Sequence, residues 1–198
     1  MIVISGPSGA GKGTLIARVL PHFRDLVVSV SATTRPRRAG EREGREYFFM
    51  GREEFLRRVE AGAFLEWAEY GGNLYGTPEA PVRTHLEAGR DVILEIELQG
   101  ARQIRERVRD AVLVFIAPPD LQELEQRLRR RNTESEEAIA KRMDHAREEM
   151  DELARDMLRE SREFHYVIVN EDVDVAAEAL IGVIEDIRKN DPERWPPA

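Results

Sequence analysis

A glycine-rich segment near the start of the chain constrains the possible folds more than any other feature. Residues 6–14 read GPSGAGKGT, which fits the pattern G-x-x-x-x-G-K through Gly6, Gly11 and Lys12. The β-branched run MIVIS precedes the segment, and a helical pattern follows it as far as Leu20. In a strand, loop and helix of this order, backbone N–H groups and the helix N-terminus face an anion. We therefore predict a phosphate-binding loop within an α/β fold.

The residues of this loop have distinct predicted roles in binding nucleotide phosphates. The glycines let the backbone approach the phosphate oxygens closely, and Lys12 supplies a positive charge for the β- and γ-phosphates. The position after this lysine usually carries a Ser or Thr whose hydroxyl meets Mg²⁺, but here it is Gly13. Thr14 lies about 100° further round the helix, so we expect Mg²⁺ to be held mainly by phosphates and water. The predicted phosphate-binding residues are Gly6, Pro7, Ser8, Gly9, Ala10, Gly11, Lys12, Gly13 and Thr14.

Strands and helices alternate in the hydrophobic pattern at both ends of the chain. The expected strands there are 1–5, 26–30, 91–98, 112–117 and 166–169, and the expected helices are 12–20, 99–108, 120–131, 134–160 and 173–188. This alternation predicts a parallel sheet with helices on both faces. The region from about 33 to 90 has more turns and shorter elements, and we interpret it as an inserted subdomain. Its expected strands and helices are 47–50, 52–61, 64–70 and 78–88.

Composition excludes several classes of protein. The 198 residues are 41% hydrophobic and 34% charged, which fits one compact domain and not a disordered chain. Cysteine is absent, so disulfides, thiolate nucleophiles and cysteine-based zinc sites are excluded. A net charge of −8 argues against broad nucleic-acid binding. No apolar run is long enough for a membrane span, and the first residues do not read as a signal peptide, so we expect a cytoplasmic protein.

Four further segments narrow the function. They read SVSATTRPRRAGEREGREY (29–47), FLEWAEYGGNLYGT (64–77), IELQGA (96–101) and FIAPP (115–119). Together with the glycine loop and an arginine-rich region, they fall in the order and spacing of one family, and from about residue 1 to 185 the chain resembles guanylate kinase. This resemblance implies transfer of the ATP γ-phosphoryl group to GMP, and to dGMP as well, with Mg²⁺ accompanying ATP.

The resemblance also implies a division of the chain. We expect one domain over 1–198, with a P-loop core, a GMP-binding insertion and a helical lid. The core would comprise about 1–32, 91–126 and 151–190, the insertion about 33–90, and the lid about 127–150.

Two arginines and two tyrosines are the expected ligands of the acceptor phosphate. Arg35 and Arg38 lie three residues apart, and paired guanidinium groups suit a dianionic phosphate through forked hydrogen bonds. Tyr47 and Tyr75 can add neutral O–H donors. By the resemblance, all four bind the GMP phosphate. The alternative for each arginine is a solvated loop charge.

Glu66 is the expected reader of the base. It lies in an apolar stretch, and its carboxylate can accept hydrogen bonds from N1–H and N2–H₂ of guanine, donors that adenine lacks. By the resemblance, the hydroxyls of Ser31 and Thr77 complete the base pocket. The alternative for Glu66 is a solvent-facing glutamate on a half-buried strand.

Glu95 and Glu97 lie two apart and share one face of an expected strand. The family usually has aspartate at the second position, so Glu97 is longer by one methylene. Glu97 is expected to contact the guanine edge, Lys12 or metal-bound water, and these alternatives stay open. The alternative for Glu95 is a structural ion pair.

The resemblance assigns three arginines to a lid over the phosphates: Arg127, Arg131 and Arg142. Together with Lys12, these are the expected catalytic residues. The acceptor oxygen is already anionic near neutral pH, so positioning and electrostatics should supply nearly all the catalysis without a general base. Asn170 matches a family position near the adenine of ATP, although on its own it reads as a turn residue after a strand.

Two rival interpretations remain. Some scaffold proteins carry guanylate-kinase-like domains that bind peptides without catalysis, but the presence of Lys12 and the lid arginines favours an enzyme. A P-loop kinase acting on another nucleotide or on a ribosyl phosphate is the second rival. The long helix 134–160 could form a coiled coil, but its charged face favours a lid helix packed on the core. Expected partners are ATP and GMP, without nucleic-acid polymer or membrane, in a monomer or homodimer.

Overall fold

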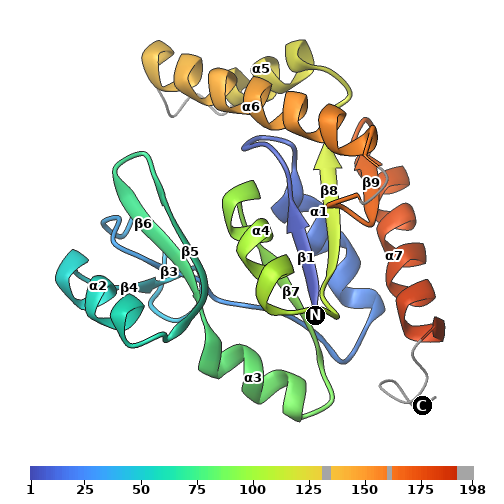
Figure 1. Cartoon of the computed structure of the whole chain (residues 1–198). Coiled ribbons are helices and arrows are strands. Elements are labelled where there is room, and N and C mark those ends of the chain that lie inside the picture. Colours follow the sequence, from blue (N-terminus) through green and yellow to red (C-terminus); the bar gives the residue numbers. More distant parts are fainter. Residues whose placement is uncertain (131–134, 160–161, 191–198) are drawn as a thin grey trace. The chain divides into compact units, whose positions relative to one another are not determined.

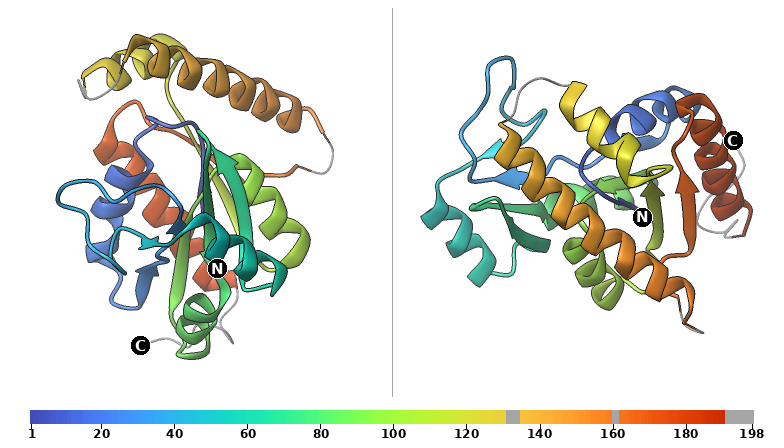
Figure 2. Two further views of the ribbon diagram at one scale, coloured as in Figure 1. Left: turned by 90° about the vertical axis from the view of Figure 1, so that its left-hand side faces the viewer. Right: turned by 90° about the horizontal axis from the view of Figure 1, so that it is seen from above.

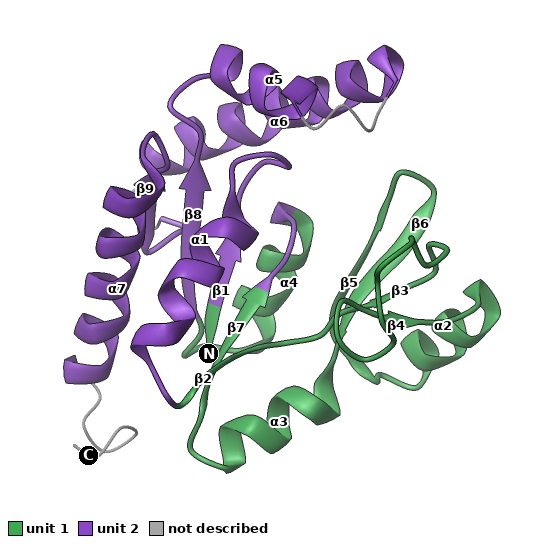
Figure 3. Ribbon diagram, turned by 180° about the vertical axis from the view of Figure 1, so that it is seen from behind, with its two compact units in different colours: residues 1–2, 25–94, 99–111 green, residues 3–24, 95–98, 112–198 purple. Residues whose placement is uncertain are grey.

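The computed structural model describes residues 1–130, 135–159 and 162–190 of an α/β protein (Figure 1). The chain divides into two compact units, coloured separately in Figure 3. Unit 1 comprises residues 1–2, 25–94 and 99–111, and unit 2 comprises residues 3–24, 95–98 and 112–198. Among the described residues, no helix is long and apolar enough to cross a membrane.

A five-stranded parallel sheet has the order β2-β7-β1-β8-β9. Its strands are β1 (Ile2–Ser5), β2 (Leu26–Val28), β7 (Asp91–Glu95), β8 (Val112–Ala117) and β9 (Tyr166–Val169). The strands β1, β7 and β8 are almost wholly buried apolar runs, as expected for a parallel sheet covered on both faces. The predicted parallel sheet flanked by helices is therefore confirmed.

The helices of unit 2 are α1 (Lys12–Val19), α5 (Leu121–Arg130), α6 (Glu136–Met157) and α7 (Val173–Asn190), and a 3₁₀ turn, η1 (Leu20–His22), follows α1. Ser135 caps α6 by accepting a hydrogen bond from the Ala138 N–H. Helices α5 and α6 lie side by side (Figure 2). The apolar face of α6 packs on α5 through Ile139 and Met143 on α6 and Leu124 on α5. The apolar stripe of the long helix therefore has a partner within its own chain.

Unit 1 contains a second sheet in the order β4-β3-β6-β5. Its strands are β3 (Ala32–Thr33), β4 (Phe48–Phe49), β5 (Phe64–Tyr70) and β6 (Asn73–Pro78). The sequence pattern predicts neither β3 nor β6, because β3 has only two residues and β6 carries Asn, Gly and Pro, which are uncommon in strands. Gly71 and Gly72, both with positive φ, form the two-residue turn that pairs β6 with β5.

Helix α2 (Arg52–Glu60) covers one face of this second sheet. Its Phe55 ring stacks on the Phe64 ring with centroids 4.5 Å apart, and Ala32 and Leu74 complete the buried cluster. The other helices of this part of the chain are α3 (Glu79–Glu87) and α4 (Leu98–Arg107). The residues of β5 and β6 that do not face α2 are therefore free to form a polar site on the opposite face.

Candidate functional site

The glycine loop after β1 has a backbone path that side chains would obstruct. Gly6 has a φ of +136°, and a Cβ at this position would overlap the backbone carbonyl of Ile116 on β8. Gly9 and Gly11 also have positive φ, with values of +98° and +92°. The loop thus lies directly against β8, and its shape depends on these glycines.

Lys12 opens α1 and is only 8% exposed. Its ammonium group donates hydrogen bonds to the backbone carbonyls of Gly6 and, over 3.2 Å, Pro7. The long side chain is therefore folded back along the loop, with its charge held among main-chain oxygens. This is the placement from which a lysine can reach phosphate oxygens bound by the loop.

Asn170, which follows β9 near the end of the described chain, is hydrogen-bonded to the glycine loop. Its side-chain Nδ2 donates to the Ala10 carbonyl over 2.8 Å, and its backbone N–H donates to the Ala117 carbonyl over 2.8 Å. Asn170 is 4% exposed and lies close to Gly11, where an added Cβ would meet its amide. The structure brings this sequence-predicted residue to the phosphate loop.

Glu95 lies beside the first turn of α1. A Cβ at Gly13 would be 3.5 Å from the Glu95 Oε2, which is ordinary contact, and Thr14 is exposed. Glu95 is open to solvent, yet the surrounding protein removes enough water to raise the pKa of its carboxyl, while the Lys12 charge opposes this change. An ionisable carboxylate therefore borders the loop at the position where the P-loop pattern usually carries a hydroxyl and this chain has Gly13.

Glu149 on α6 is a polar residue at this site that the sequence analysis missed. Desolvation, and then the neighbouring charge of Glu97, raise the pKa of Glu149 to about 8, while Lys12 acts in the opposite direction. Its Oε2 is buried and has no hydrogen-bond partner among the described residues. The helical period could have revealed it, because Glu149 lies three residues after Ala146 and four before Leu153, both buried.

The expected lid arginines have different surroundings. Arg127 on α5 is half-buried, and its guanidinium donates to Glu123 over 2.9 Å and to the Glu171 carbonyl over 3.4 Å. Arg142 is half-buried on α6, whereas Arg131 lies outside the described residues. The structure therefore places two of the three on neighbouring helices, without testing their catalytic role.

In unit 1, a β-bulge determines the direction of Glu66. Strands β5 and β6 are antiparallel, and their register shifts between Phe64 and Glu66. Phe64 and Trp67 consequently both pack toward α2, and Glu66 points to the opposite face. There the Thr77 hydroxyl donates to the Glu66 Oε1 over 2.6 Å, and the two side chains are 0% and 4% exposed, respectively. The alternative of a solvent-facing glutamate is wrong.

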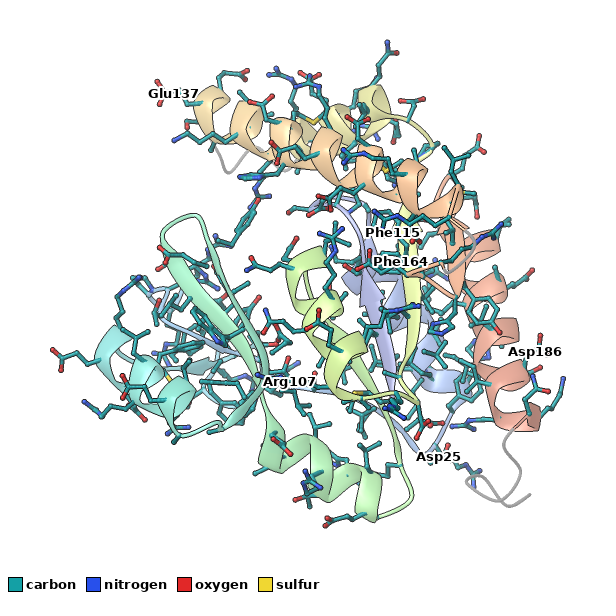
Figure 4. All side chains as sticks on the ribbon, viewed as in Figure 1. Asp25, Arg107, Phe115, Glu137, Phe164 and Asp186 are labelled. Carbon is teal, nitrogen blue, oxygen red and sulfur yellow. The ribbon has the colours of Figure 1, made fainter. Side chains whose placement is uncertain are left out.

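Helix α4 supports the bulged strand. Arg107, labelled in Figure 4, lies on this helix. Its Nη1 donates to the carbonyls of Phe64 and Leu65 over 3.0 Å in each case. Gln103 exchanges two hydrogen bonds with the backbone of Trp67, at 2.7 and 3.2 Å. One turn earlier, Gly100 faces the Glu66 carboxylate so closely that a Cβ there would overlap Oε2. Side chains of α4 therefore hydrogen-bond backbone groups of β5 at and next to the bulge. Gly100 on the same helix leaves room for the Glu66 carboxylate.

An aromatic and cationic cluster occupies the same sheet. The Tyr47 and Tyr75 rings meet edge to face with centroids 6.0 Å apart, and the Arg35 guanidinium carbon lies 5.4 Å from the Tyr47 ring centre. Tyr75 and Thr77 are two apart on β6, so they share the face to which Glu66 points. The structure thus brings Arg35, Tyr47 and Tyr75 into contact on the sheet that carries Glu66.

The remaining predicted acceptor residues are less enclosed. Arg38 is exposed in the loop before β4. Ser31 is half-buried immediately before β3, and its carbonyl accepts from the Phe48 N–H. Glu97 lies in unit 2, with Lys12 and Glu149.

Over most of its length, the chain is similar to proteins of one known family. The guanylate kinase family profile matches residues 1–187. A guanylate kinase of Parasynechococcus marenigrum is 52% identical over 184 residues, covering 93% of this chain and 97% of the relative. One from Rubrobacter xylanophilus is 51% identical over 187 residues and covers 94% of each chain. The crystal structure of guanylate kinase from Anaplasma phagocytophilum superposes with a TM-score of 0.71 at 31% identity, covering 100% of this chain and 96% of that one.

Proposed function

The chain belongs to the guanylate kinase family, and we propose how its residues divide the work of the family's reaction, the ATP-dependent phosphorylation of GMP to GDP. Members of this family are ATP-dependent kinases, which generally use a divalent metal. Their two substrates, ATP and GMP, are small molecules. The reaction joins a GMP phosphate oxygen to the γ-phosphorus of ATP and breaks the bond from that phosphorus to ADP. Because both reactants are anions, the protein's main task is to hold them in line and neutralise charge.

Glu66 reads guanine in this proposal, and its buried carboxylate beside Thr77 is the observation that carries it. A carboxylate that is 4% exposed needs donors, and Thr77 supplies one to Oε1. The N1–H and N2–H₂ edge of guanine offers two parallel donors that fit a carboxylate. Adenine would present a lone pair at N1 instead, leaving the buried charge without that partner. Ser31 and Glu97 are proposed to complete recognition of the base.

The GMP phosphate binds Arg35, Arg38, Tyr47 and Tyr75 in this proposal. The contact of the Arg35 guanidinium with the Tyr47 ring, and of that ring with the Tyr75 ring, supports it, since all three side chains then lie together on the sheet. A dianionic phosphate suits this mixture of charged and neutral donors.

On the ATP side, residues 6–14 bind the phosphates through backbone N–H groups, and Lys12 moves its ammonium from the loop carbonyls to the β- and γ-phosphate oxygens. Asn170 is proposed to support the loop and the adenine side of ATP. Arg127, Arg131 and Arg142 are proposed to neutralise the moving phosphoryl group and exclude water, which limits hydrolysis of ATP.

We take the divalent metal to be Mg²⁺. Gly13 provides no hydroxyl, but Mg²⁺ commonly keeps several waters, and Glu95 borders the loop where it can accept hydrogen bonds from such waters. The residues therefore fit a metal held by phosphates and water. When bound, it would neutralise charge on the β- and γ-phosphates.

We also propose that the chain is one domain with three functional parts. We assign about 1–32, 91–126 and 151–190 to the core, about 33–90 to the GMP-binding insertion and about 127–150 to the lid, within one domain. A cytoplasmic location and a monomer or homodimer complete the proposal.

A series of three nucleoside monophosphates tests whether Glu66 recognises the guanine base. GMP carries both donors, IMP keeps N1–H but lacks the 2-amino group, and AMP has neither. Steady-state kcat/KM at saturating ATP should fall from GMP to IMP and again to AMP, by roughly 5- to 150-fold for each lost donor. A protein that phosphorylates AMP as efficiently as GMP would contradict the role of Glu66.

A further inference from the structure

We propose that Glu41 is a positioning residue for GMP, whose carboxylate orients the Arg35 guanidinium toward the incoming phosphate. The inference rests on the proposed function, because Glu41 matters in this way only if Arg35 binds that phosphate. Glu41 belongs to the loop before β4 and is absent from the residues assigned above to substrate binding.

Arg35 and Glu41 form a bidentate ion pair. Nη2 of Arg35 donates to Oε1 over 2.7 Å, and Nη1 donates to Oε2 over 3.1 Å. The side chains are 12% and 17% exposed, so this is not an open surface pair. Their mutual hydrogen bonds raise the pKa of Arg35 and lower the pKa of Glu41. Two parallel bonds fix the plane of the guanidinium as well as its distance.

The pair uses only one edge of the guanidinium. Glu41 takes one N–H from each terminal nitrogen, and the Pro36 carbonyl accepts from Nη1 over 2.7 Å. Among the described residues, neither the Nε–H nor the second Nη2–H of Arg35 has a hydrogen-bond acceptor. These two donors lie side by side on the adjacent edge, which is a fork suited to two phosphate oxygens.

Glu41 also fixes the backbone that carries the second arginine. Its Oε2 accepts the Arg38 N–H over 2.7 Å, and its own N–H donates to the Arg38 carbonyl over 3.2 Å. Gly40, with a φ of +87°, permits the tight turn between them. One carboxylate thereby organises both arginines that are proposed to hold the phosphate.

Competition with the substrate is the opposite possibility, since a carboxylate is itself an anion. The geometry favours positioning, because Glu41 leaves a complete fork of Arg35 unused and the Tyr47 ring holds the guanidinium from its face. A long arginine side chain that is already ordered loses less conformational freedom when the phosphate binds. The two possibilities predict opposite changes in GMP affinity.

Calorimetric titration of the full-length protein with GMP and with guanosine tests the proposal. Glu41→Ala should raise the Kd for GMP by about 3- to 10-fold, the cost of ordering one long side chain, and leave the Kd for guanosine unchanged. Glu41→Gln keeps one acceptor oxygen and should give a smaller rise. Glu46→Ala is the matched control, because this neighbouring carboxylate accepts a loop N–H, from Arg42, and should change neither Kd.

A double-mutant cycle separates the outcomes. If Glu41 acts through Arg35, Glu41→Ala should have little further effect on the Kd for GMP in an Arg35→Ala background. Tighter GMP binding by Glu41→Ala, or equal loss of GMP and guanosine affinity, would overturn the proposal. If Arg35→Ala weakens GMP binding but Glu41→Ala does not, only the role of Glu41 fails. If Arg35→Ala has no effect, the phosphate role of Arg35 fails and the role of Glu41 with it.

Discussion

The glycine loop at residues 6–14 and the bulged sheet that carries Glu66 place their polar groups by different means. In the loop, the groups that can meet an anion are mainly backbone N–H groups of consecutive residues, shaped by glycines with positive φ. On the sheet, the polar groups are side chains from separate strands, turned to one face by a bulge and supported by α4. One continuous segment of sequence is therefore enough to form the backbone site, whereas the side-chain site forms only when several strands and helices pack together.

This difference predicts how each region responds to substitution. Changes in the loop should affect ATP and turnover, and changes on the sheet should affect GMP alone. The variants below separate the two regions, beginning with the largest expected effect.

Lys12→Ala should lower kcat by about 10²–10³-fold, because it removes the buried charge beside the loop that stabilises the transferred phosphoryl group. Far-UV circular dichroism should show an intact fold. Lys189→Ala on α7 is the control, since in the described part of the chain that exposed lysine pairs with carboxylates of its own helix. Turnover near that of the unmodified protein would remove Lys12 from the mechanism.

Glu66→Gln should raise the KM for GMP by roughly 5- to 150-fold, while the KM for ATP changes little. The amide retains an acceptor for one guanine donor but opposes the second with its own N–H₂. Glu69→Gln lies on the same strand, is exposed, and should leave both KM values unchanged. Equal losses for the two nucleotides would contradict independent sites.

Gly100→Ala should weaken GMP binding by about 10-fold, because the added methyl group displaces the Glu66 carboxylate from its position beside Thr77. Gly182→Ala on α7 has open space around it and should stabilise the protein by up to about 1 kcal/mol without changing either affinity. Isothermal titration with GMP and thermal unfolding of both variants distinguish these effects. Unchanged GMP affinity in Gly100→Ala would show that Glu66 tolerates displacement.

Glu149→Gln should change the pH dependence of stability, which is the smallest of these effects. The folded protein keeps Glu149 protonated up to about pH 8, but the unfolded chain releases this proton near pH 4.5. Stability of the unmodified protein should therefore fall relative to Glu149→Gln as pH rises from 5 to 8, and the difference should then level off. Desolvation is the largest cause of the raised pKa of Glu149, and the charges of Glu97, Lys12 and Glu152, which face this carboxyl, modify it.

Melting temperatures measured across this pH range provide the test. Glu137→Gln, at the exposed opposite end of the same helix (Figure 4), is the control and should retain the pH dependence of the unmodified protein. A pH-independent difference between the unmodified protein and Glu149→Gln would contradict the buried protonated state.

Much of the fold followed from short-range patterns. The buried strands β1 and β8 were predicted with nearly their observed bounds, because continuous apolar runs between turns have few other solutions. The family resemblance, the parallel sheet and the kinase function are confirmed. Strand β6 was missed, because its Asn73, Gly76 and Pro78 oppose strand propensity, and pairing with β3 and β5 makes it a strand.

The candidate site was predictable in its residue types but not in its geometry. The carboxylate of Glu66 could be singled out by its apolar neighbours, yet the bulge that aims it, and the Gly100 that makes room for it, arise from strand register and helix packing. Glu41 and Glu149 read as ordinary surface charges until the structure shows Arg35 and Glu97 beside them.

By itself, the sequence determined a phosphate-binding loop, since a contiguous run of glycines and one lysine specifies both its backbone and its charge. The tertiary structure alone decided which carboxylates are buried, which guanidinium edge stays unoccupied and which helix supports the bulged strand. The physical reason is that burial and hydrogen bonding of these groups depend on residues far apart in the chain, and no local pattern encodes those distances.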